Sequence, residues 1–284
     1  MHLSIVFQYL VFYHSAYDLC NDFLIIFYFI RRTIISMENL FELALESAES
    51  AGRGAEIGER RLSPFLRRLT FSSASASYGS AEGSVCHTLI LDADPLEEES
   101  LSEEIASGVA ETITSLGCGR GRRVLVVGLG NSSAVVDALG TETVGRLSAG
   151  EKGRKYLATV LPSVFGVTGM ESAAVVRGVA GEYRPDLILS VDTLSTRRAE
   201  RLARAVQISD GGIVPGGGVG NRREPITPSA LGVPVISLGV SLLAHADRCA
   251  SLPPSLVVTP KEIDLLVPLF ASALARGVER ALFE

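Results

Sequence analysis

Two aspartates occupy the positions in this chain that most clearly suggest chemistry. Asp137 follows a strand-like run that ends in glycines, at residues 124–130, and Asp192 comes directly after the apolar run at 187–191. In an open α/β sheet, ligands bind in the crevice beyond the carboxyl ends of parallel strands. Two acids delivered there by different strands can converge on one substrate. The spacing therefore predicts a paired-carboxylate site and a hydrolase, although an aspartate before a helix is also a common N-cap.

The composition predicts one medium-sized catalytic domain and argues against several other classes. The chain has 284 residues, 47% of them hydrophobic, which is enough to bury a substantial core. The formal net charge of −6 and the absence of long Lys/Arg runs do not support nucleic-acid binding. Such a chain would suit a basic protein substrate better. The four cysteines form no CxxC pair, and His87 and His245 have no partner at metal-ligand spacing. We therefore expect no metal, no cofactor and a reducing cytoplasm.

The chain divides into three segments. Residues 1–36 contain two apolar stretches, each too short to span a membrane. We interpret them as an upstream leader that is not part of the native protein, with Met37 as the true start; the alternative is a membrane-associated leader. Residues 37–84 form the propeptide and an N-terminal segment, with a short amphipathic helix at 38–46 and then a sequence rich in Arg, Ser, Ala and Gly. Parts of it, notably 71–77, have loop composition. Residues 85–284 form the main domain.

Strand and helix patterns alternate through this main domain. Apolar runs predict strands, and apolar residues at three- and four-residue steps predict helices. The expected strands are 85–91, 123–127, 156–161, 186–191, 205–209 and 231–240, and the expected helices are 97–116, 137–147, 170–183 and 260–283. This alternation predicts an α/β fold: a single domain with a mostly parallel sheet flanked by helices.

Two glycine-rich loops leave alternatives open. Residues 128–133 nearly match the dinucleotide fingerprint GxGxxG, but Ser133 replaces the third glycine. Residues 215–221 could cradle a phosphate, but they lack the GKS or GKT ending of a P-loop, which favours a substrate-side or subunit-contact loop.

Taken together, several blocks of residues resemble one family. They are 128–131, 137–140, 165–171, 191–194, 207–213 and 215–221. In order and spacing they resemble the germination protease of endospore-forming bacteria. The resemblance implies a homotetrameric endopeptidase, made as a zymogen, that degrades small acid-soluble spore proteins in the spore core during germination. It also implies a fold similar to that of hydrogenase maturation proteases, with no direct nucleic-acid or membrane partner.

The resemblance assigns roles to individual residues. The two essential aspartates of the family fall on Asp137 and Asp192. Residues implied to bind substrate or shape the backbone loops are Gly128, Gly130, Asn131, Thr168, Gly169 and Glu171. The bond between Glu42 and Leu43 resembles the family's propeptide cleavage site and predicts self-processing there. The chain departs from the family pattern at Ser132, and at 135–136 before the first aspartate.

The expected mechanism is acid–base hydrolysis of a peptide bond without a covalent intermediate. Two close carboxyl groups cannot both ionise easily, so one holds a proton while the other acts as a base on water. The sequence does not say which aspartate takes which role. The alternatives are a metal-dependent maturation-type protease and a noncatalytic nucleotide-binding α/β protein.

Overall fold

The computed structural model describes residues 27–28, 43–50, 57–72, 83–149, 156–217, 223–246 and 256–284. The predicted leader, apart from 27–28, and Glu42 of the predicted processing site lie outside these residues. So does the second half of the glycine-rich loop at 215–221.

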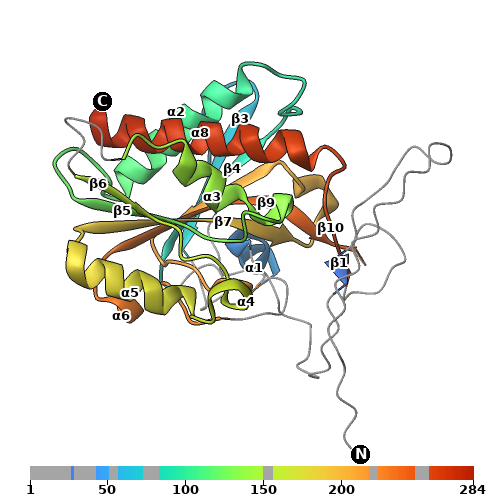
Figure 1. Ribbon diagram of the computed structural model, residues 1–284. Coiled ribbons are helices and arrows are strands. Elements are labelled where there is room, and N and C mark those ends of the chain that lie inside the picture. Colours follow the sequence, from blue (N-terminus) through green and yellow to red (C-terminus); the bar gives the residue numbers. More distant parts are fainter. Residues whose placement is uncertain are drawn as a thin grey trace, which may run out of the picture.

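Strands and helices alternate through most of the described chain (Figure 1). The strands are β1 (Phe27–Tyr28), β2 (Gly58–Arg61), β3 (Leu66–Ser72), β4 (Val85–Leu91), β5 (Val124–Gly128), β6 (Leu157–Val160), β7 (Leu187–Thr196), β8 (Ala205–Ser209), β9 (Val235–His245) and β10 (Leu256–Val258). The α-helices are α1 (Ala44–Ser50), α2 (Leu101–Ser115), α3 (Leu139–Gly145), α4 (Phe165–Thr168), α5 (Ser172–Tyr183), α6 (Pro228–Leu231) and α8 (Ile263–Phe283), and short 3₁₀ turns are η2 (Val135–Asp137) and η3 (Ala199–Arg201).

All the described strands join one mixed sheet. Its order is β2-β3-β4-β8-β9-β7-β5-β6, and β10 and β1 continue from β9. The strands β6, β5, β7 and β9 run parallel, whereas β9 pairs antiparallel with β8, and β8, β4, β3 and β2 follow antiparallel. The predicted α/β fold is confirmed, and its parallel part is the half that carries both aspartates.

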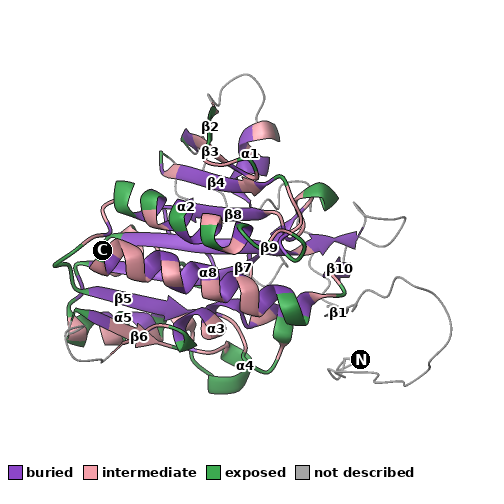
Figure 2. Ribbon diagram, turned by 90° about the horizontal axis from the view of Figure 1, so that it is seen from above, coloured by how far each residue is buried: buried purple, intermediate pink, exposed green. Residues whose placement is uncertain are grey.

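Helices cover both faces of the sheet (Figure 1). The helices α2, α3 and α8 lie on one face and α5 and α6 on the other. Successive residues of β5 alternate between these layers: Val124 and Val126 join the cluster with α2 and α8, and Leu125 and Val127 join the cluster with α5. This explains the unbroken apolar run of a strand covered on both sides. Figure 2 shows the resulting buried band through the sheet and the inner sides of the helices. Each such fully buried side chain contributes about 1.5–3 kcal/mol to stability.

The C-terminal helix was predicted correctly. Residues of α8 at helical spacing are buried against α2 and α3, namely Ile263, Leu266, Phe270, Leu274, Val278 and Leu282. Pro268 is accommodated inside this helix. None of the helices in the described ranges has the length and hydropathy that a membrane crossing requires.

The stretch between the N-terminal helix and residue 84 holds two strands that were not predicted, and the loop expected at 71–77 is wrong at Phe71 and Ser72, which belong to β3. The strands β2 and β3 lie there and pair antiparallel. Their sequence is rich in arginine because β2 is an edge strand of the sheet and because the arginines of β3 pair with acidic side chains of neighbouring elements. Arg67 donates through Nε to both carboxylate oxygens of Asp92, at 3.0 and 2.9 Å, and Arg68 lies 3.1 Å from Glu111. A strand built on such pairs lacks the apolar alternation that reveals buried strands.

Several element boundaries also differ from the predictions. The helix expected from residue 137 begins at Leu139 as α3, after the 3₁₀ turn η2. The helix expected from 170 begins at Ser172 as α5, and the short helix α4 precedes it, with Gly169 at φ +70° after α4. The strand expected at 231–240 begins at Val235 and runs on to His245, because the short helix α6 occupies its expected start. The helix expected at 38–46 overlaps α1, which begins at Ala44 and runs to Ser50; the part before Leu43 lies outside the described residues.

Candidate active site

The loop after β5 holds Asp137 through its backbone. The chain turns at Gly130, whose φ of +96° suits glycine alone among common residues. A Cβ at Gly130 would overlap the carbonyl oxygen of Asp137. This close approach lets the Asn131 N–H donate to the carbonyl oxygen of Asp137 at 3.1 Å and to its Oδ2 at 2.9 Å. Gly130 is therefore required for the bond that orients the first carboxyl group.

A second glycine packs α3 against two strands. A Cβ at Gly140 would overlap the carbonyl oxygens of Leu129 and Val191, and one at Gly128 would overlap the carbonyl oxygen of Gly140. The Leu129 N–H also donates to the Val191 oxygen, at 2.9 Å. The end of β5, the start of α3 and the middle of β7 thus meet with no space for side chains.

Asp192 lies inside β7, which corrects the prediction that it follows the strand. The strand continues to Thr196 because β9, which is one residue longer, pairs with it from Ile188 to the end. β5, however, ends at Gly128, opposite Val191. Asp192 is therefore the first residue of β7 beyond the end of β5, which keeps it at the carboxyl edge of that pair. Its side chain is buried, with 6% exposed, and its Oδ1 accepts the Thr193 N–H at 2.8 Å.

A hydrogen bond ties the two aspartate-bearing segments together. The Thr193 hydroxyl, next to Asp192, donates to the carbonyl oxygen of Val136, next to Asp137, at 2.8 Å. Thr193 is buried. Sequence reasoning missed this role, and the only available signal was its position beside an aspartate. The bond brings the two acids to the same end of the sheet from separate elements.

The environment of Asp137 alters its titration. Burial raises the pKa of Asp137 from 3.8 to about 6, and the hydrogen bond from the Asn131 N–H acts in the opposite direction. A carboxyl group with such a pKa can hold or release a proton near neutral pH, which is the property that general acid–base catalysis needs.

The predicted residues Thr168, Gly169 and Glu171 lie beyond the carboxyl end of β6, the strand next to β5. Glu171 pairs with Arg223 at 3.4 Å, and the Arg223 guanidinium stacks over the ring of Phe165 at 5.0 Å. The Phe165 side chain is exposed. The exposed apolar residues of this corner are Leu161, Phe165, Val167 and Met170. The contacts among Phe165, Glu171 and Arg223 thus lie outside the loop that carries Asp137.

Leu43 of the predicted processing site is fully buried. It packs in the cluster of Leu125, Val127 and Leu129, on the face of the sheet that α5 covers. The N-terminal segment is thus integrated into the domain beside the end of β5.

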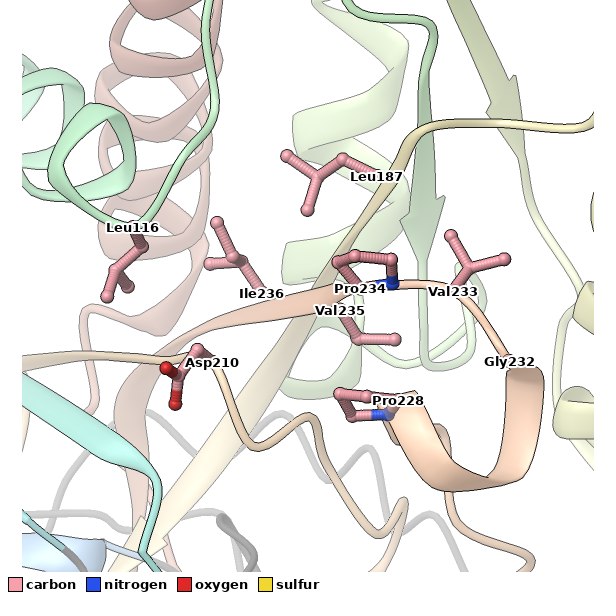
Figure 3. A pocket seen from close by; sticks show the side chains of 9 residues that line it. All are labelled: Leu116, Leu187, Asp210, Pro228, Gly232, Val233, Pro234, Val235 and Ile236. Carbon is pink, nitrogen blue, oxygen red and sulfur yellow. The ribbon is translucent and has the colours of Figure 1, made fainter.

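A pocket of about 530 Å³ lies at the other end of the strands (Figure 3). It is lined by Leu116, Leu187, Asp210, Pro228, Gly232, Val233, Pro234, Val235 and Ile236. Leu187 begins β7, and Asp192 is roughly 16 Å further along at about 3.3 Å per residue. The pocket is therefore separate from Asp137 and Asp192. The described residues contain no group of three or more His, Cys, Asp or Glu that could hold a metal ion.

An α/β sheet that presents two carboxyl groups at the carboxyl edge of its parallel strands, one with a raised pKa, has the parts of an acid–base hydrolase. The germination protease family model matches residues 84–251, which is more than half of the chain. The chain therefore belongs to the germination protease family and is a peptidase, and the resemblance found in the sequence is confirmed.

Individual relatives agree with this assignment. The chain is 35% identical over 236 residues to the germination protease of Caldanaerobacter subterraneus subsp. tengcongensis, covering 64% of this chain and 73% of the relative. It is 30% identical over 246 residues to that of Clostridium acetobutylicum, covering 68% and 75%. Among solved structures, a NiFe hydrogenase maturation protease, HycI from Thermococcus kodakarensis, aligns with a TM-score of 0.37 and 17% identity, covering 56% of this chain and 94% of that one.

Proposed function

We propose that the chain is an endopeptidase that hydrolyses small acid-soluble spore proteins during spore germination, using Asp137 and Asp192 as an acid–base pair. Family membership supports the peptidase activity. The observation that supports the pair is the Thr193–Val136 hydrogen bond, which links the segments of both aspartates at one end of the sheet.

In this mechanism the two carboxyl groups share one proton. Burial raises the pKa of Asp137 to about 6, so we assign it the shared proton in the fraction of enzyme that holds one, a fraction that grows as the pH falls toward 6. Asp192 then accepts a proton from a water molecule as the water oxygen attacks the peptide carbonyl carbon. Asp137 gives its proton to the leaving amine as the carbon–nitrogen bond breaks. General acid–base catalysis of this kind supplies about 10²- to 10⁴-fold of the rate.

The neighbouring residues take supporting roles in the proposal. The Asn131 N–H is already bonded to Asp137, so Asn131 orients the acid rather than the substrate. Gly128 and Gly130 allow the close backbone packing. Thr168, Gly169 and Glu171 line the exposed apolar corner beyond β6, where an extended substrate would lie next to the site.

The proposal includes a zymogen that cuts itself between Glu42 and Leu43 and so removes the residues before Leu43. The processed enzyme assembles as a homotetramer and acts in the spore core. Because Leu43 is fully buried, the bond before it must leave its position to enter an active site. N-terminal sequencing after incubation at mildly acidic pH tests this step, and a product that begins elsewhere than Leu43 contradicts it.

The decisive experiment replaces each acid by its amide. Asp137→Asn and Asp192→Asn should each lower cleavage of a purified small acid-soluble spore protein by at least about 10³-fold, because each removes one partner of the proton exchange. Circular dichroism should show an unchanged fold. The matched control is Asp186→Asn, just before β7, where the side chain accepts the Arg123 N–H at 2.8 Å.

Full activity in either site variant would remove that residue from the mechanism. Loss of wild-type activity after exhaustive chelation would favour the metal-dependent alternative. Thermal stabilisation by a dinucleotide, without proteolysis, would favour a nucleotide-binding protein.

A further inference from the structure

The helix α1 carries a buried carboxylate that no part of the proposed chemistry uses. Glu46 is only 2% exposed, although the acids of an amphipathic helix usually face solvent. Burying a charged group is costly unless it is paired and hydrogen-bonded. The partners of Glu46 therefore indicate what the carboxylate is for.

Those partners lie at the far end of the strand that carries Asp192. Oε2 of Glu46 accepts the backbone N–H of Arg197 at 2.9 Å, and Oε1 accepts the hydroxyl of Thr196. The Arg201 guanidinium lies 3.7 Å from Oε1 and supplies the opposite charge. One carboxylate thus binds the last residue of β7, the residue after it and the turn that follows.

The strand is irregular between Asp192 and this attachment. The register of β7 against β9 shifts between Leu194 and Ser195, which interrupts the regular ladder. A bulge bends a strand and redirects its side chains. β5 ends at Gly128, so of the two parallel neighbours of β7 only β9 pairs with this part of the strand. Asp192 itself is paired with Gly239 before the bulge, so an attachment beyond the bulge holds the stretch of β7 that directly follows the aspartate.

The helix that delivers Glu46 is itself firmly anchored. The Ala44 N–H donates to the side-chain oxygen of Gln207 in β8. Leu45 is fully buried in a cluster with Phe71 of β3 and Cys86 of β4. The carboxylate is thus held from the antiparallel half of the sheet and contacts the parallel half.

We propose that Glu46 is a positioning residue of the active site: by clamping Thr196 and Arg197 it fixes the bulged end of β7 and thereby the orientation of Asp192. This role rests on the proposed function of Asp192. It also makes residues 43–50 part of the working peptidase, rather than part of the expected N-terminal segment outside the domain.

The test compares two glutamates of the same helix. Glu46→Ala should lower kcat for a small acid-soluble spore protein by about 10- to 100-fold, because a small misplacement of a reacting group is that costly. KM should change less than about threefold, since the substrate corner is untouched. Glu46→Gln keeps an acceptor for the Arg197 N–H and should restore most of kcat.

Glu49→Ala is the matched control. Glu49 also pairs with arginines, at 3.0 Å to Arg198 and 2.5 Å to Arg201. Its side chain is 25% exposed, however, and both of these contacts are made to side chains rather than to the backbone of β7. Its removal should change kcat by less than about threefold, as expected for a partly solvated ion pair.

Hydrogen exchange of the amides of residues 193–197 tests the clamp without any substrate. Exchange should become faster in Glu46→Ala and stay unchanged in Glu49→Ala. If Glu46→Ala does not fold, Thr196→Val removes the hydroxyl partner of Glu46, together with that hydroxyl's bonds to the Arg198 backbone, and should give the same changes to a smaller extent. Equal effects of Glu46→Ala and Glu49→Ala, or unchanged exchange in the folded Glu46 and Thr196 variants, would overturn the proposal. An inactive wild-type protein would instead refute the proposed function, and the exchange measurement would still decide the clamp.

Discussion

The two aspartate regions are built in opposite ways. Asp137 is fixed by contacts within the short stretch from Gly128 to Gly140, where glycines allow backbone groups to touch. Asp192 is fixed by partners far away in the sequence, through the pairing with β9 and the carboxylate of Glu46. One half of the site is therefore specified by a short stretch of sequence and the other by the assembled fold. Substitutions in the two halves should differ in their effects on stability and on kcat.

The largest effect is expected where the local region allows no added atom. Gly140→Ala should destabilise the protein by about 3 kcal/mol, because the new Cβ overlaps two backbone carbonyl oxygens that cannot move independently. Gly145→Ala, in the same helix, meets nothing within 4 Å and should stabilise it by about 0.5–1 kcal/mol. Urea unfolding measures both. Similar values for the two variants would show that the close approach at Gly140 is not needed.

A smaller effect is expected at the bond that joins the two regions. Thr193→Val should cost about 1–3 kcal/mol, because it leaves the buried carbonyl oxygen of Val136 without its donor. It should also lower kcat about tenfold, since the two acids lose their common tie. Thr259→Val is the control: its buried hydroxyl donates to the Leu242 oxygen at 3.0 Å, in a contact that involves neither aspartate. It should lower stability by a similar amount without affecting kcat; an equal loss of kcat would contradict the special role of Thr193.

The smallest effect concerns the charge of Asp137. Its pKa is raised by folding, from 3.8 to about 6, so its favourable contribution is complete below pH 3.8 and is lost as the pH rises through 6. At pH 7.5, Asp137→Asn should therefore be more stable than the wild type by about 1–2 kcal/mol, allowing for partial solvent screening. The difference should shrink as the pH is lowered toward 4. Urea unfolding across this range measures it, and a difference that grows on acidification would reverse the assigned sign.

The sequence was most informative where one residue type has one physical reason to be present. The apolar runs of β4, β5 and β8 predicted buried strands, and Gly128 and Gly130 marked the turn and the close backbone approach before Asp137. The approximate position of Asp192 was also predictable, but not that β7 continues past it. That continuation depends on the length of β9, more than forty residues later, and no local pattern records it.

Other features had no usable signal in the sequence. The arginines of β2 and β3 hide an edge hairpin, because its charges are neutralised by Asp92 and Glu111 from other elements. Glu46 follows the same helical pattern as any solvated acid, and only its partners at Thr196 and Arg197 distinguish it. Residues that act through tertiary contacts are in general invisible to periodicity, which reports which face is buried and not what it meets.

The attachment of α1 also has a consequence for the order of assembly. The Ala44 bond to Gln207 spans 163 positions along the chain, and the Glu46 bond to Thr196 spans 150. Contacts of such sequence separation form slowly, because the entropy of closing a long loop is lost before the contact is gained. During refolding, helical circular dichroism should therefore return before enzymatic competence, which awaits the docking of the first described helix onto strands made much later in synthesis.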